Sequence, residues 1–67
     1  MGEIVLEQFD RVKLISDKFK EDGLNPGMVG YILEIYPDGN LEVEFSDSST
    51  GTTIALITLS PSDVTSV

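Results

Sequence analysis

The titratable side chains of this chain are mostly carboxylates. The 67 residues include 12 Asp and Glu but neither Cys nor His, so thiolate nucleophiles, imidazole acid-base groups and zinc sites built on either are excluded. Only carboxylate and carbonyl oxygens remain as ligands for a hard cation. The sequence also lacks a nucleophile-base pair, a phosphate-binding loop and a cofactor motif. We therefore expect no catalytic residue, no cofactor and no enzymatic activity.

One loop superficially resembles a calcium site. Residues 46–52 contain Asp47 and Gly51, but carboxylates do not recur at the alternating positions that a calcium loop needs. We expect no metal site there.

Charge is distributed unevenly along the chain. The only cations are Arg11, Lys13, Lys18 and Lys20. Eight carboxylates lie between Glu21 and Asp63, and the formal net charge is −8. A surface of this sign repels nucleic acid and attracts cationic partners, and among the four cations only Phe19 could stack on a base. The expected partner is a basic protein rather than a nucleic acid.

Two segments with alternating side chains, residues 28–36 and 41–45, predict a β-hairpin joined by Pro37, Asp38 and Gly39. A two-residue turn would mix the apolar and acidic faces, whereas a three-residue loop with Gly39 in the left-handed conformation keeps them apart. In that register Glu34 lies opposite Glu42. The predicted core face then carries Tyr31, Leu33, Ile35, Leu41, Val43 and Phe45.

The other face of this hairpin is the candidate partner-binding site. Besides Gly30 and Asn40, it is predicted to carry Ile32, Glu34, Tyr36, Glu42 and Glu44. Like charges paired across a sheet are destabilising. One interpretation is a solvated face on an acidic protein; the other is an anionic docking patch, flanked by Ile32 and Tyr36, whose repulsion a cationic partner relieves.

The remaining segments complete a small all-β domain. Residues 9–15 alternate as a strand with one wet face, and residues 16–27 form a long loop in which Phe19 and Leu24 could pack inward. Residues 53–59 form a strand that is apolar on both faces, so its register is left open. Ser60 and Pro61 begin a one-turn helix, and residues 64–67 form a last strand. Residues 1–8 are a leader or an extra strand, and residues 9–67 are the domain.

This order of elements predicts an SH3-like, partly open barrel of about five short strands, with a long first loop and a one-turn 3₁₀ helix before the last strand. Such a chain buries only a thin core. No secretion signal or membrane span is recognisable, so we expect a cytoplasmic protein that is a monomer or a weak homo-oligomer.

Several segments beyond Gln8 resemble a family of small bacterial proteins, common in cyanobacteria, that is catalogued as a domain of unknown function. The resemblance rests on residues 10–14, 23–24, 27–32, 42–45 and 55–61. It brings no catalytic or ligand-binding residue with it. Some members appear beside genes for other small proteins, an arrangement similar to antitoxin or immunity pairs.

Residues 27–32 are also similar to the KOW motif of ribosomal and transcription-factor barrels, where flanking loops bring Lys and Arg to RNA. Here the matching strands and loops carry acids instead. The first functional hypothesis is therefore a non-enzymatic acidic module that binds a more basic protein, as an antitoxin-like or immunity-like partner, through the acidic hairpin face or an unpaired strand edge. The alternative is a KOW-like RNA or ribosome-associated factor.

Overall fold

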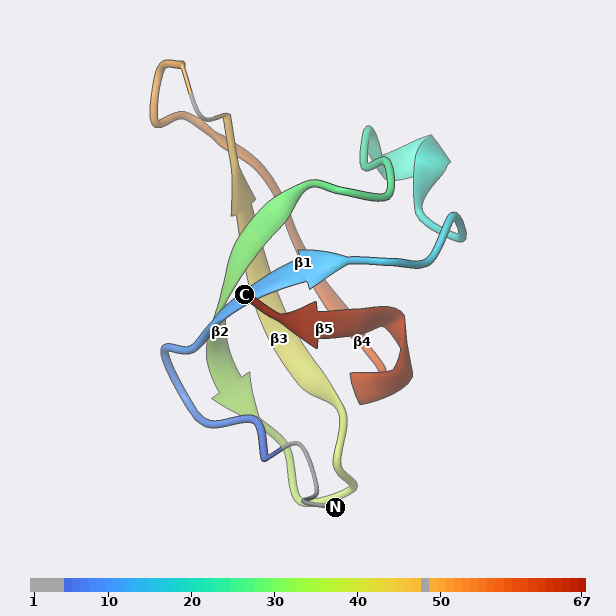
Figure 1. Ribbon diagram of the computed structural model, residues 1–67, viewed down its shortest axis with the longest axis vertical. Helices are drawn as coiled ribbons and strands as arrows, with labels where there is room; N and C mark the ends of the chain where they lie inside the picture. Colours follow the sequence, from blue (N-terminus) through green and yellow to red (C-terminus); the bar gives the residue numbers. More distant parts are fainter. Residues whose placement is uncertain (1–4, 48) are drawn as a thin grey trace.

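Five antiparallel strands form one sheet in the computed structural model, which describes residues 5–47 and 49–67. The strands are β1 (Arg11–Leu14), β2 (Val29–Ile35), β3 (Leu41–Ser46), β4 (Thr53–Leu59) and β5 (Val64–Ser66). Their order across the sheet is β4-β3-β2-β1-β5, and the strands are strongly curved (Figure 1). The predicted all-β fold with about five short strands is confirmed.

Two short 3₁₀ turns are the only helical elements in the described residues. The turn η2 (Pro61–Asp63) precedes β5, as predicted, and η1 (Lys20–Asp22) lies in the long loop. The Ser60 side chain and Asp63 form a reciprocal capping box around η2, which satisfies backbone donors at the start of the turn. In the part of the chain that the structure describes, no helix is long and apolar enough to cross a membrane.

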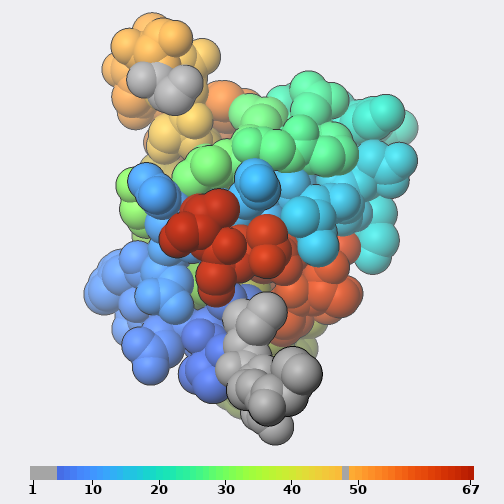
Figure 2. Space-filling model, in the orientation of Figure 1, coloured from blue at the N-terminus to red at the C-terminus, as the bar shows by residue number. Residues whose placement is uncertain are grey.

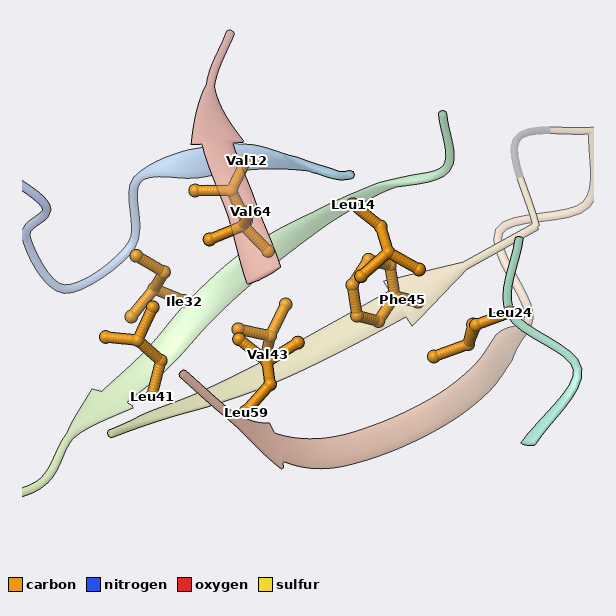
Figure 3. Close-up of a cluster of buried hydrophobic side chains, with 9 residues drawn as sticks. All are labelled: Val12, Leu14, Leu24, Ile32, Leu41, Val43, Phe45, Leu59 and Val64. Carbon is orange, nitrogen blue, oxygen red and sulfur yellow. The ribbon is translucent and has the colours of Figure 1, made fainter. Parts of the chain in front are cut away.

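The core draws on all five strands and on the long loop. Its nine buried hydrophobic residues are Val12, Leu14, Leu24, Ile32, Leu41, Val43, Phe45, Leu59 and Val64. Leu24 lies in the same cluster as Phe45 although it belongs to the loop (Figure 3). Phe19 packs against this cluster and is partly buried. The prediction that these two loop residues pack inward is therefore confirmed.

The long loop is also tied to the end of the chain by charge. Lys18 Nζ lies 3.1 Å from Asp63 Oδ1, and the backbone N–H of Ser60 donates to Asp63 Oδ2 at 3.0 Å. Burial alone would raise the pKa of Asp63, but the hydrogen bonds from Ser60, Lys18 and Ser16 and the charge of Lys18 outweigh burial and lower the pKa. In Figure 2 the loop lies against the C-terminal segment.

The hairpin between β2 and β3 has the predicted turn. The N–H of Tyr36 donates to the carbonyl of Asn40 at 2.9 Å, and Gly39 has a φ of 92°, the left-handed region that suits glycine. Glu34 is the cross-strand partner of Glu42, as predicted. The three-residue loop therefore sets the register next to the turn.

Farther from the turn the predicted register is wrong, because β2 contains a β-bulge between Ile32 and Glu34. The extra residue, Leu33, shifts the pairing so that Ile32 lies opposite Val43 and Tyr31 opposite Glu44. A one-residue shift exchanges the two faces of a strand. Ile32 is consequently fully buried in the core, and Tyr31, predicted to face the core, is 48% exposed.

The segment before β1 donates hydrogen bonds to the residues of the bulge. The Gln8 side-chain amide donates to the carbonyl of Leu33 at 3.0 Å, and the N–H of Phe9 donates to the carbonyl of Ile32. Residues 1–4 of the predicted leader lie outside the described residues. Residues 5–8 form no strand, but Leu6 packs against the core. This segment therefore contributes to packing beside β2.

Two further features of the sheet affect the candidate site. The register of β4, which the sequence left open, places Ala55, Ile57 and Leu59 opposite the core residues of β3, so that Leu56 and Thr58 point outward. Gly30 is buried where β2 crosses β3, and a Cβ at this position would lie 2.6 Å from the carbonyl oxygen of Glu44. Only glycine allows the two strands this close approach.

Candidate functional site

Four of the five predicted site residues lie together on the outer face of β2 and β3 and in the turn that joins them. We call Glu34, Tyr36, Glu42 and Glu44 the acidic face. Glu34 and Glu42 are direct cross-strand partners, and Glu44 is two residues along the same strand as Glu42. The fifth predicted residue, Ile32, does not belong to the site, because the bulge turns it into the core.

Glu42 is held in place by two hydroxyl groups. The Tyr36 hydroxyl donates to Glu42 Oε1 at 2.5 Å, and the Thr58 hydroxyl donates to the same oxygen at 3.2 Å. Glu42 is half-buried, so its carboxylate has a defined position and not the freedom of a fully exposed side chain. Its other oxygen, Oε2, receives neither of these hydrogen bonds.

The same hydrogen bond changes the proton affinity of Tyr36. Donation to Glu42, followed by desolvation and by the negative charges of Glu42, Glu34 and Asp38, raises the pKa of Tyr36 above its ordinary value of 10.0. The phenol therefore stays protonated at neutral pH and remains a donor.

Glu44 has different neighbours. The Thr53 hydroxyl donates to Glu44 Oε2 at 2.6 Å. Tyr31 and Leu56 are its cross-strand partners on either side, and both are about half-exposed. Apolar surface therefore flanks Glu44, supplied by these two residues in place of the predicted Ile32. The sequence did not predict Tyr31 as a neighbour of Glu44, because the pattern of residues 31–34 does not indicate a bulge.

In the described residues no Lys or Arg forms an ion pair with the glutamates of the acidic face. Within residues 5–47 and 49–67 the one ion pair joins Lys18 of the long loop to Asp63 of η2. Neither residue belongs to the acidic face. The side-chain hydrogen bonds that Glu42 and Glu44 accept come from the hydroxyls of Tyr36, Thr53 and Thr58. No ion pair within the described residues therefore occupies these three carboxylates.

An open hollow of about 340 Å³ lies between the long loop and the β3–β4 end of the sheet, lined by Gly27, Met28, Val29, Ser46, Asp47 and Ile54. Its single carboxylate, Asp47, accepts the N–H groups of Ser49 at 2.7 Å and Thr50 at 3.2 Å. Asp47 thus stabilises its own turn. In the described part of the chain, no group of three or more acidic residues is arranged to hold a metal ion.

What the site can do chemically follows from these groups. The acidic face offers carboxylate acceptors, one phenol and flanking apolar surface on an outer sheet face, and such an arrangement suits recognition of cations by hydrogen bonds and charge.

Comparisons with known proteins place the domain but not its activity. The family model described as "Domain of unknown function (DUF4926)" matches residues 8–66, which confirms the resemblance to a family of unknown function. No curated protein and no solved structure matches the chain. The SH3-like and KOW-like descriptions therefore remain predictions.

Proposed function

Because the chain belongs to the DUF4926 family, a family of unknown function, its role must be argued from its own residues, and we propose that it is a non-enzymatic module whose acidic face binds a more basic protein. One observation carries this proposal. Glu42 is fixed by Tyr36 and Thr58 directly opposite Glu34, although like charges in that arrangement are destabilising.

A cationic partner would turn this repulsion into attraction. Lys or Arg placed between Glu34 and Glu42 would neutralise two charges that oppose each other in the free protein. The net charge of −8 would add long-range steering, so the association rate should fall as salt rises.

Apolar surface beside the charges supports the same proposal. Tyr31 and Leu56 flank Glu44, and Tyr36 borders Glu42. Tyrosine is enriched among the residues that contribute most to protein interfaces. A partner could thus bury aromatic and aliphatic surface while pairing its cations with the glutamates.

The finer part of the proposal is a neutralising role in the cytoplasm, antitoxin-like or immunity-like, in which covering a basic surface blocks the partner's activity. The alternative, a KOW-like RNA-binding factor, is less compatible with an acidic outer face, because phosphates are repelled by carboxylates.

Affinity purification from the native cell tests the proposal with three forms of the protein. In the first variant Glu34, Glu42 and Glu44 are each replaced by Gln. In the control variant, Asp17→Asn, Glu21→Gln and Asp22→Asn remove the same number of charges from the long loop. We expect the wild type and the loop variant to retain a basic protein that the acidic-face variant loses.

The complex should also weaken as ionic strength rises. Equal retention by the two variants, or a complex indifferent to salt, would contradict the proposal. Recovery of RNA by the wild type, lost after nuclease treatment together with all bound protein, would favour the alternative.

A further inference from the structure

The strand β4 is an edge of the sheet with nothing paired to its outer side in the described residues. It contains seven residues, about 23 Å of extended chain, and its neighbour in the sheet is β3. None of the backbone hydrogen bonds that the described residues make outside the sheet ladders involves Thr53–Leu59. In an antiparallel pair every second residue directs its N–H and C=O away from the partner, so β4 presents a row of unused donors and acceptors.

This edge has little of the protection that edge strands usually carry. Between Thr53 and Leu59 there is no charged residue and no Pro, and these are residues that usually block pairing with another chain. A bulge interrupts the β3–β4 ladder between Ala55 and Thr53. From Ala55 to Leu59 the pairing is regular, which leaves a stretch without a bulge for an added strand.

The side chains beside this edge define what could be added. On the outer face Thr58 lies next to Glu42, and Leu56 lies next to Glu44. A strand added to β4 would lie about 9.6 Å from β3, two strand spacings away. Lys or Arg on that strand could lay its aliphatic stem over Leu56 and place its charge beside Glu44, and a second cation two residues away could reach Glu42.

On the other face the added strand would continue the core. Ala55 and Ile57 of β4 are half-buried and pack against the core cluster. Apolar side chains at the alternate positions of an added strand would cover them.

From these observations we propose that β4 pairs with an extended segment of the partner in which basic and apolar residues alternate. This inference rests on the proposed function and names the partner's binding element. Charge argues against a second copy of this chain in that position: each copy carries −8, and the β4 of a second copy has no cation to place beside Glu42 or Glu44.

A short synthetic peptide of alternating lysine and valine tests the inference by NMR and amide hydrogen exchange on the whole chain at low salt. We expect the peptide to bind and to protect outward-facing amides of β4 from exchange. Two further peptides carry N-methyl groups, one on every lysine amide and the other on every valine amide. In an extended strand these two sets of amides point to opposite edges.

One methylated peptide should bind like the parent, and the other should bind about tenfold or more weakly, since it has lost the hydrogen bonds to β4. Leu56→Lys, at an exposed position, should also weaken the parent peptide by placing a cation beside Glu44, whereas Leu56→Thr should keep most of the binding.

Four results would overturn the inference. The first three are no binding of the parent peptide at low salt, equal affinity of the two methylated peptides, and β4 protection that appears without peptide and grows with protein concentration, as for a second copy. Peptide-induced changes at Glu34 and Tyr36 without protection of β4 would also overturn it while leaving the proposed function intact. The native-cell purification decides the proposed function separately.

Discussion

Replacing Glu34 by Gln should make the folded protein more stable. Glu34 and Glu42 are cross-strand partners on the outer face of the sheet, and Glu42 is kept in position by the Tyr36 hydroxyl. The substitution removes one of two facing negative charges but keeps the size and shape of the side chain. The free energy of unfolding should therefore rise.

The magnitude follows from the register. Cross-strand partners have Cβ atoms about 5 Å apart, which puts the two carboxylates about 6 Å apart. Two unit charges at that distance repel by about 0.7 kcal/mol in water, and a Debye length of about 8 Å reduces this to about 0.3 kcal/mol at physiological ionic strength. Screening by salt should thus shrink the gain.

Urea unfolding followed by circular dichroism measures the effect. With an m-value of about 1 kcal/mol/M, the midpoint of the Glu34→Gln variant should rise by about 0.3–0.7 M, with the larger shift at low salt. Glu21→Gln is the control, because Glu21 lies in η1 beside Lys20 and removing its charge relieves no facing carboxylate. This control should not raise the midpoint.

Two outcomes would refute the electrostatic reasoning. One is a Glu34→Gln variant less stable than the wild type. The other is a gain that persists unchanged in about 1 M salt, where the Debye length is about 3 Å. If the gain is found together with weaker partner binding, the same charge opposes folding and favours binding.

Three other measurements probe the structure around the site. Gly30→Ala should destabilise the fold by about 1–3 kcal/mol in urea unfolding, because its Cβ would meet a β3 carbonyl. Gly27→Ala has open space around the new Cβ but a φ of 99°, and this backbone strain should cost about 1–2 kcal/mol. Equal stability of Gly30→Ala and the wild type would contradict the close approach of β2 and β3. The raised pKa of Tyr36 should fall toward 10.0 in Glu42→Gln, since the carboxylate that favours the protonated phenol is gone. Ultraviolet titration measures this pKa, and the same pKa in the variant and the wild type would contradict the hydrogen bond. The pKa of Asp63 is lower in the folded protein than its ordinary value of 3.8, so the stability that Asp63 contributes is present above that value and is lost as pH falls through the folded pKa. Asp63→Asn should therefore be less stable than the wild type at neutral pH. A stability difference between the two proteins that does not shrink in acid would argue against this role of Asp63.

Local rules predicted the part of the site nearest the turn. Pro37 and Gly39 fixed a three-residue loop, and parity then placed Glu34 opposite Glu42, as the structure has it. The alternation of β3, with Leu41, Val43 and Phe45 buried, was equally readable, since a strand with one face in the core repeats every second residue.

The part of the site beyond Glu34 was not predictable in this way. Leu33 forms a bulge whose carbonyl is satisfied by Gln8, a residue 25 positions earlier in the chain. A contact over that distance leaves no mark on the local pattern. Ile32 and Tyr31 therefore exchanged faces relative to the prediction. The register of β4 was hidden for another reason, because both of its faces are apolar in sequence.

The sequence by itself determined the composition of the surface and the class of fold: a chain of short alternating strands, punctuated by glycine and proline, with its cations confined to the first 20 residues. The tertiary structure alone decided which residues accompany the glutamates, and it left β4 at an edge of the sheet. The physical reason is that strand parity is a local property, whereas bulges, edges and cross-strand neighbours depend on which distant segment supplies the next hydrogen bond.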